Sequence, residues 1–226
     1  MMIRITNRQG LCMTPTQIPT PQLKQIKQVS DGWIKKYILR YELPDGSLIS
    51  YEGVSRKGPE DYSRELMHDA GYIHKSDAVC IVPRTTTGEL VLIKEFRYPL
   101  NSWVIAFPAG LVDGDEDLFN AVTRELQEET GYGICTIDGK PQYHALSRPG
   151  YSSTGMSEES VQVVYALVEK IGEPKPEPNE FIEVFTVLIS DLERFLNETT
   201  LPIGTRAQLI LESIIHRSGY DLFKND

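Results

Sequence analysis

The sequence lacks several features that would define its class. No run of about 18 apolar residues occurs, so no segment is expected to span a membrane. Its start, MMIRITNRQGLCMTP, has no apolar core of a secretory signal, which makes the cytoplasm the expected location. The cysteines Cys12, Cys80 and Cys135 show no CxxC spacing, so we expect free thiols rather than a disulfide framework or a zinc site.

Positive charge is also scarce. The chain has 23 Lys and Arg against 32 Asp and Glu, a formal net charge of −9. This balance argues against binding to nucleic acid or to an anionic membrane surface, both of which need basic patches. An anionic small-molecule ligand would therefore need a bound cation or a local group of arginines.

The chain is expected to have three parts. Residues 1–24 contain prolines among polar residues without a clear period and predict an N-terminal arm. Residues 25–75 predict a small β domain with a linker, and residues 76–226 predict a larger domain. In the small domain, β-rich runs at about 33–41 and 47–56 flank LPDGS, whose Pro-Asp-Gly favours a tight turn. These runs predict an antiparallel hairpin.

The hairpin needs a partner surface. Two strands alone are marginally stable in water, so the hairpin has to pack on the rest of the chain or on a second subunit. The next stretch, residues 59–75, predicts a short helix or an irregular insertion.

The larger domain mixes strands with helices, which predicts a layered α/β fold. Apolar, β-rich runs predict strands at 78–83, 89–96, 103–107, 160–168 and 181–189. Helical patterns lie within 108–132 and at 190–198 and 204–218. In the first of these, an apolar face repeats at helical spacing through Leu118, Ala121, Val122 and Leu126. Asp115 or Asp117 can cap its start, and Gly131 its end.

The end of this helix carries a concentration of negative charge. Glu125, Glu128 and Glu129 lie within five positions and share one face. Like charges at these spacings cost roughly 0.2–0.5 kcal/mol per pair. The carboxyl end of a helix disfavours anions by a further 0.3–1 kcal/mol or so each. A divalent cation would offset this repulsion, because oxygen ligands suit Mg²⁺ or Mn²⁺. The alternative is a solvated helix face, which most charge runs are.

The spacing around these glutamates has a recognisable pattern. From Gly110 to Gly131 the sequence reads G-x5-E-x7-R-E-U-x-E-E-x-G, with every fixed position filled. This arrangement resembles the signature of the Nudix hydrolases. The resemblance implies a Nudix α/β/α sandwich, here with a small N-terminal antiparallel β domain, and hydrolysis of a nucleoside diphosphate linked to another group.

The resemblance also assigns roles within the box. Glu125 and Glu129 would be metal ligands, Glu128 a ligand or a neighbour of the ligands, and the carbonyl of Ala109 a further oxygen donor. The expected cation is Mg²⁺, with Mn²⁺ as an alternative. Glu116 and Arg124 would form an ion pair that shapes the loop before the helix.

Residues outside the box resemble the ADP-ribose and ADP-sugar pyrophosphatases, beginning with KEFRYPLNSWVIAFPAG. This resemblance implies a homodimer with exchanged N-terminal domains, in which Trp33 and Tyr51 from different subunits sandwich adenine. Arg56 and Arg97 would contact the phosphates or the terminal sugar, and Met156 would lie near the terminal ribose. The alternatives are cross-strand packing for the aromatics, solvated strand ends for the arginines and loop packing for the methionine.

Two further features bear on the resemblance: a candidate carboxylate base and one position where the sequence differs from these relatives. EPNEFIEVFTV matches the loop that carries a water-activating glutamate, at Glu180 with Glu183 as second choice. The alternative is an exposed acidic loop. Position 106 is Ala where the relatives often carry Glu, which bears on substrate choice.

The sequence therefore predicts metal-dependent hydrolysis of ADP-ribose or a related ADP-sugar, giving AMP and a sugar phosphate. One alternative is another nucleoside diphosphate derivative, such as GDP-mannose or an oxidised nucleotide. The other is a non-catalytic Nudix module that senses ADP-ribose.

Overall fold

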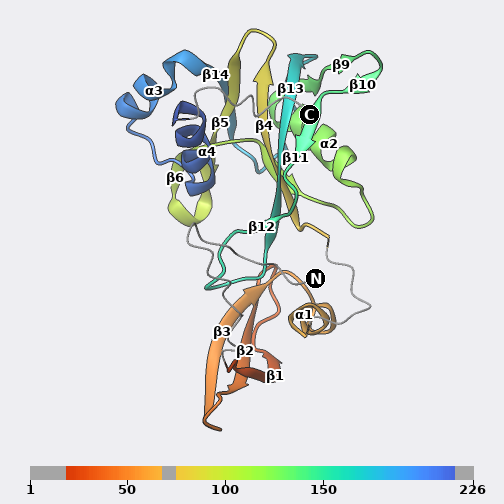
Figure 1. Ribbon diagram of the computed structural model, residues 1–226, viewed down its shortest axis with the longest axis vertical. Coiled ribbons are helices and arrows are strands. Elements are labelled where there is room, and N and C mark those ends of the chain that lie inside the picture. The colour runs from red at the N-terminus through yellow and green to blue at the C-terminus, as the bar shows by residue number, and fades with distance from the viewer. Residues whose placement is uncertain (1–18, 68–74, 217–226) are drawn as a thin grey trace, which may run out of the picture. The chain divides into compact units, whose positions relative to one another are not determined.

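The computed structural model describes residues 19–67 and 75–216 (Figure 1). The chain divides into two compact units. The first comprises the residues up to His74 together with Gly155–Ser157, and the second comprises the rest. Most of the predicted N-terminal arm, Cys12 and the end of the predicted insertion lie outside the described residues. No helix in the described parts is long and apolar enough to cross a membrane.

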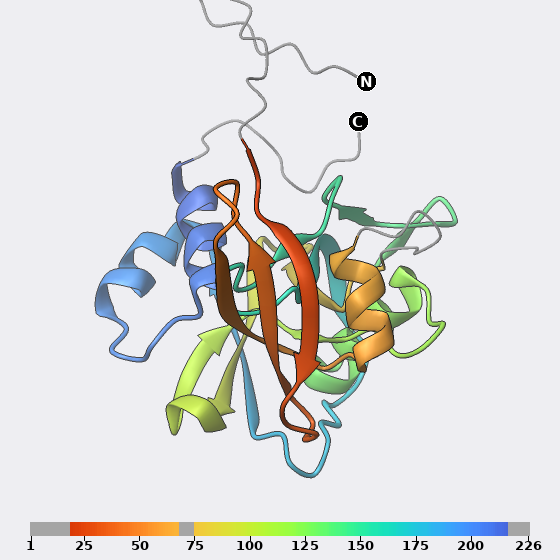
Figure 2. The same cartoon turned by 90° about the horizontal axis from the view of Figure 1, so that it is seen from below.

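The first unit is a three-stranded antiparallel sheet in the order β1-β2-β3 (Figure 2). The strands are β1 (Gln22–Gln28), β2 (Lys35–Glu42) and β3 (Leu48–Ser55). β2 and β3 form the predicted hairpin. Gly46 adopts a φ of 82° in its turn, and Asp45 accepts a hydrogen bond from the Ser47 amide at 2.9 Å. The Pro-Asp-Gly turn is thus confirmed.

One helix, α1 (Pro59–Leu66), gives this sheet a small core. Tyr62 of the helix packs on Tyr37 of β2, with ring centroids 4.5 Å apart, and Leu39 completes the buried cluster. Leu23 of β1 packs against the same cluster. This packing explains why the strand begins inside the stretch predicted as an arm.

The second unit is built on a nine-stranded mixed sheet whose main path is β11-β13-β4-β5-β14. Its long strands are β4 (Ala78–Thr85), β5 (Glu89–Arg97), β6 (Ser102–Ala106), β13 (Ser160–Lys170) and β14 (Ile182–Leu188). These confirm the five predicted strands. The short ones are β7 (Ala109–Leu111), β8 (Tyr132–Ile134), β11 (Tyr143–Ala145) and β12 (Gly150–Tyr151), and a separate pair is β9 (Thr136–Ile137) with β10 (Lys140–Pro141). β4 and β13 run parallel, and the other pairs are antiparallel.

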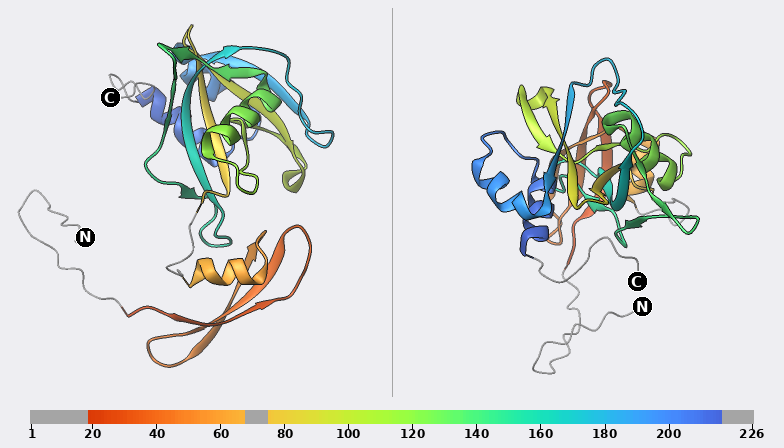
Figure 3. Two further views of the ribbon diagram at one scale, coloured as in Figure 1. Left: turned by 90° about the vertical axis from the view of Figure 1, so that its right-hand side faces the viewer. Right: turned by 90° about the horizontal axis from the view of Figure 1, so that it is seen from above.

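Helices cover both faces of this sheet, as the right-hand view of Figure 3 shows. On one face lies α2 (Leu118–Thr130); on the other lie α3 (Leu192–Glu198) and α4 (Thr205–His216). Two short 3-10 turns, η1 (Tyr98–Leu100) and η2 (Ile189–Asp191), complete the unit. Residues of β4 alternate between the faces: Cys80 and Val82 join the α3–α4 core, while Val79 and Ile81 join the α2 core. The α/β/α sandwich is therefore confirmed.

Candidate active site

Helix α2 begins and ends where the sequence predicts. The Asp117 carboxylate accepts a hydrogen bond from the Asn120 amide at 2.9 Å and caps the start. Gly131 ends the helix in the left-handed conformation, with a φ of 71°. The apolar face is fully buried through Ala121, Val122 and Leu126. The opposite side of the last turns is thus fixed in place to present the glutamates.

The loop after β13 covers the carboxyl end of α2. The amides of Ile171 and Gly172 donate to the Gly131 carbonyl, each at 3.0 Å, and the Lys175 amide donates to the Glu128 carbonyl at 2.7 Å. A Cβ at Gly131 would lie 2.3 Å from the Gly172 carbonyl oxygen, so only glycine permits this approach. These N–H groups meet helix carbonyls that would otherwise lack partners. The same loop runs on to the residue predicted as the base.

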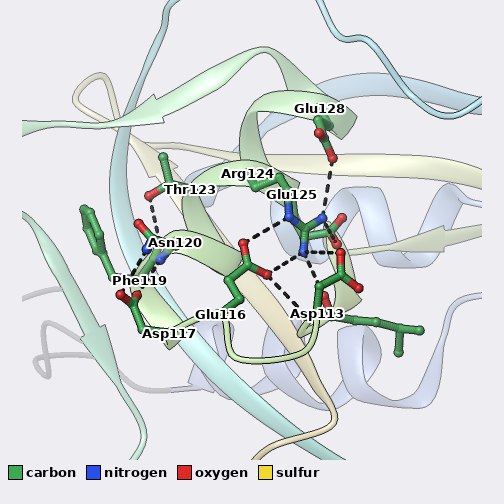
Figure 4. Close-up of polar contacts among 10 residues, drawn as sticks. Asp113, Glu116, Asp117, Phe119, Asn120, Thr123, Arg124, Glu125 and Glu128 are labelled. Carbon is green, nitrogen blue, oxygen red and sulfur yellow. Dashed lines mark hydrogen bonds and ion pairs between the residues drawn. The ribbon is translucent and has the colours of Figure 1, made fainter.

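Arg124 is the centre of a polar network at this helix (Figure 4). Its Nε and Nη2 donate to the two carboxylate oxygens of Glu116 at 3.1 and 2.9 Å, and Nη2 also donates to the Leu111 carbonyl at 2.9 Å. Its Nη1 lies 2.7 Å from Glu125 and 3.5 Å from Glu128. The predicted Glu116–Arg124 ion pair is thus present, and it ties the loop before α2 to the helix.

The charges in this network reinforce one another. The hydrogen bonds from Arg124 hold the pKa of Glu116 below its ordinary value, despite partial burial. The carboxylate hydrogen bonds in turn raise the pKa of Arg124, so its charge is permanent. Part of the repulsion among the glutamates is therefore offset by this guanidinium rather than by a bound ion.

The carboxylates of Glu125 and Glu129 converge on the backbone at Ala109 and Gly110. The Ala109 amide donates to Glu129 Oε2 at 3.0 Å. A Cβ at Gly110 would lie 1.9 Å from Glu125 Oε1, so the fixed glycine of the box leaves room for that carboxylate. Both side chains are nearly buried, with exposed fractions of 8% for Glu125 and 3% for Glu129.

Burial makes ionisation of these two groups unfavourable. It raises the pKa of Glu125, although the contact with Arg124 opposes the rise. It raises the pKa of Glu129 more strongly, with only the Ala109 hydrogen bond opposing it. No cation among the described residues pairs with Glu129. A buried carboxylate without a cationic partner is costly to ionise.

Two further glutamates lie close enough to influence this pair. The negative charge of Glu180 raises the pKa of both Glu125 and Glu129. Glu95, on β5, has the same effect on Glu129, and the sequence reasoning missed it. Strand alternation places Glu95 on the same side of β5 as Arg97, but only the tertiary structure shows that this side faces α2.

The donor set suits a hard divalent cation. Glu125, Glu128 and Glu129 offer carboxylate oxygens from the last turns of α2, and the Glu125 carboxylate occupies the space that a Cβ at Gly110 would fill. In the described parts of the chain, no three acidic, histidine or cysteine side chains are already gathered around one point. Arg124 lies between Glu125 and Glu128 instead. The glutamates therefore have the chemistry that a divalent cation needs, but their oxygens are not yet gathered around one point.

The structure separates the two candidate bases. Glu180 lies at the end of the loop before β14, with its Oε2 accepting from the Glu177 amide at 2.9 Å, and its charge reaches the buried carboxylates. Glu183 lies on β14 and forms an ion pair with Lys94 of β5 at 2.5 Å. Lys94 also stands over the Trp103 ring, 5.1 Å from its centroid. This arrangement favours Glu180.

The predicted substrate-binding residues are distributed between the units. Arg97 lies at the end of β5, paired with Glu95. Trp33, Tyr51 and Met156 belong to the first unit and are exposed, Trp33 at 74%. The Tyr51 hydroxyl donates to the Gly155 carbonyl at 2.8 Å. The Met156 carbonyl accepts from the Val54 amide at 2.9 Å, so the loop segment returning to the first unit is held along β3.

Arg56 follows β3 directly. Its carbonyl accepts a hydrogen bond from Lys35 Nζ at 3.0 Å, which fixes the backbone at that position. The structure therefore brings the box residues and Glu180 together in one unit and places the expected adenine contacts in the other.

Comparison with known proteins agrees with this geometry. A NUDIX domain model matches residues 74–205, which contain the whole box and its loop. This chain belongs to the NUDIX family. The NUDIX protein is 34% identical over 144 residues to the ADP-ribose pyrophosphatase of Saccharomyces cerevisiae, an alignment that spans 59% of each chain.

Two further comparisons cover more of the NUDIX chain. It is 29% identical over 208 residues to the ADP-sugar pyrophosphatase of Mus musculus, covering 86% of this chain and 84% of the relative. A crystal structure of an ADP compounds hydrolase matches with a TM-score of 0.65 at 18% identity, covering 87% of this chain and 93% of the other. The last likeness concerns the fold alone.

Proposed function

We propose that this NUDIX hydrolase cleaves the diphosphate of ADP-ribose or a related ADP-sugar to AMP and a sugar phosphate. The observation that carries the proposal is the convergence of Glu125 and Glu129 on the Ala109–Gly110 backbone, with Glu180 close by. The names of the yeast and mouse relatives support the substrate class.

The residues divide the work as follows. Glu125 and Glu129, with Glu128 and the Ala109 carbonyl, would hold Mg²⁺ or Mn²⁺, which supplies charge for the phosphoryl oxygens and acidifies water. Glu180 accepts the proton of the attacking water as it adds to one phosphorus of the diphosphate. Arg97 and Arg56 bind the phosphates or the terminal sugar. The ion pair between Glu116 and Arg124 holds the loop before α2 against the helix.

Recognition of the adenine base is assigned to the first unit. Trp33 is largely exposed and Tyr51 is half-exposed, so both present ring surface that a ligand can cover. Leu48 and Ile49 of the same hairpin are also exposed. We assign the two aromatics to an adenine sandwich between subunits of a homodimer with exchanged N-terminal domains, with Met156 near the terminal ribose. The cytoplasmic location remains a prediction from the sequence.

A substrate panel tests the proposal. Purified protein with Mg²⁺ is incubated with ADP-ribose, ADP-glucose, GDP-mannose and an oxidised nucleotide, and the released phosphomonoesters are measured after phosphatase treatment. We expect turnover to be highest with an ADP-sugar. Higher turnover with GDP-mannose or the oxidised nucleotide would replace the substrate assignment, and tight ADP-ribose binding without turnover would favour a sensor.

A further inference from the structure

Arg206 lies at the start of α4, and the backbone around it is anchored to the sheet. The Ile105 amide of β6 donates to the Pro202 carbonyl at 2.8 Å, and the Gly204 amide donates back to the Ile105 carbonyl at 2.9 Å. The next helix residue, Ala207, is buried in the core beneath the sheet. The Cα position of Arg206 is therefore fixed by the fold and not by its side chain.

The guanidinium of Arg206 has two neutral partners, one in a loop and one on β4. Its Nη2 donates to Ser152 Oγ at 3.2 Å, in the loop between β12 and β13. It also contacts the buried Cys80 thiol, where it opposes the rise in the pKa of that thiol caused by burial. Cys80 pairs across β4 and β7 with Ala109, and its thiol senses the charge of Glu129. One strand thus separates Arg206 from the backbone on which the glutamates converge.

This arginine differs from the others near the site in its partners. Arg97 and Arg124 each form ion pairs with glutamates. Arg206 contacts a hydroxyl and a thiol, and no carboxylate pairs with it among the described residues. The chain has a formal net charge of −9, and this partly buried guanidinium is held by neutral groups. Its positive charge is therefore available to an anionic ligand.

We propose that Arg206 binds a non-bridging oxygen of the substrate's diphosphate, with Ser152 holding the guanidinium in place. This inference rests on the proposed function, because it names a further group that recognises the same substrate. Arg206 adds a cation from the C-terminal helix, on the side of the sheet opposite to α2. The diphosphate would then be contacted from both layers of the sandwich.

The competing role is structural. If Arg206 only ties the loop at Ser152 to α4, then removing the serine hydroxyl should do the same damage as removing the guanidinium. Arg194 on α3 offers a matched control, because it is an exposed arginine whose ion pair with Asp191 lies within the end of η2 and the start of α3.

The experiment compares four variants of the full chain: Arg206→Met, Arg206→Lys, Ser152→Ala and Arg194→Met. Steady-state hydrolysis of ADP-ribose gives kcat and KM, and thermal melting reports on folding. Loss of a charge-assisted hydrogen bond predicts a fall of roughly 10- to 100-fold in kcat/KM for Arg206→Met. Arg206→Lys should recover part of this loss. Ser152→Ala should lose less than Arg206→Met, and Arg194→Met should match wild type.

Binding of magnesium pyrophosphate, measured by calorimetry, separates this inference from the proposed function. Wild type should bind it at least about tenfold more tightly than Arg206→Met. Equal affinities, or a Ser152→Ala variant as impaired as Arg206→Met, would overturn the inference even if ADP-ribose is hydrolysed. Should Arg206→Met fail to fold, Arg206→Lys decides. A lower kcat/KM and a lower pyrophosphate affinity at an unchanged melting temperature support the inference, because lysine lacks the planar fork of donors. Unchanged kcat/KM and unchanged pyrophosphate affinity in Arg206→Lys would overturn it. Absence of ADP-sugar turnover in wild type would refute the proposed function alone.

Discussion

Gly110→Ala probes the site at the point where the two buried carboxylates meet the backbone. The new Cβ would lie 1.9 Å from Oε1, 2.0 Å from Cδ and 2.3 Å from Oε2 of Glu125. Ordinary van der Waals contact begins at 3.4 Å, so the carboxylate has to withdraw. The obstructing group is the end of a flexible side chain, so the fold can absorb the change. The functional geometry cannot, because Mg²⁺ requires oxygen ligands at about 2.0–2.1 Å.

The expected magnitude follows from that displacement. A misplacement of about 1 Å at a reacting centre can cost about 100-fold in rate, so kcat should fall by roughly that factor. The Mg²⁺ concentration for half-maximal activity should rise at the same time. Activity is measured as AMP released from ADP-ribose across a magnesium titration, and folding by thermal melting.

The control for this variant is Gly150→Ala on β12. A Cβ there meets nothing within 4 Å and the backbone has no positive φ, so the variant should keep activity and melting temperature. Wild-type activity and magnesium dependence in a folded Gly110→Ala protein would refute the assignment of Glu125 beside the Gly110 backbone as a metal ligand.

Three further predictions follow from the same site. Glu129→Gln should lower kcat by orders of magnitude while the metal-free protein at neutral pH melts no lower than wild type, since an uncompensated buried charge is removed; unchanged turnover would exclude a metal role. Glu180→Gln should lower kcat with little change in KM, whereas Glu183→Gln should leave kcat nearly unchanged; a loss confined to KM would make Glu180 a binding residue. Burial raises the pKa of Glu129 above 4.5, so the folded state binds this proton more tightly than the unfolded state. The resulting gain in folding stability is fully present below about pH 4.5 and is lost as pH rises through the raised pKa. In EDTA, the melting temperature of Glu129→Gln relative to wild type should therefore increase with pH, and a constant difference would contradict the burial argument.

Several parts of the fold could be predicted because local sequence determines them. The Pro-Asp-Gly turn, the Asp117 cap and the Gly131 stop are each explained by one or two residues. The apolar runs of β4 and β5 are continuous because both faces of the sheet are covered by helices. The spacing of the box placed Glu125 and Glu129 on one helix face, which the structure shows turned toward β7.

The remaining parts depend on contacts between distant segments. β1 alternates weakly between polar and apolar residues, and it becomes a strand by pairing with β2 and packing near Tyr37. β7 spans three residues and exists through its pairing with β4. The return of Gly155–Ser157 to the first unit depends on the backbone bond between Val54 and Met156, which no sequence pattern signals.

The candidate site shows the same division. Sequence reasoning found the crowded glutamates and expected a divalent cation to offset their repulsion. The structure adds Arg124, which contacts Glu125 and Glu128, and the loop amides that donate to the last carbonyls of α2. Glu95 influences Glu129 from β5, and it belongs to no motif.

The central claim is that Glu125 and Glu129 hold a divalent cation together. Crystals of the Glu180→Gln variant, grown with ADP-ribose and Mn²⁺, would test it by anomalous diffraction. The account predicts an anomalous peak within coordination distance of both carboxylates, about 2.0–2.3 Å from their oxygens. A structure with nucleotide bound, Arg124 still paired to Glu125 and no anomalous peak beside Gly110 would contradict it.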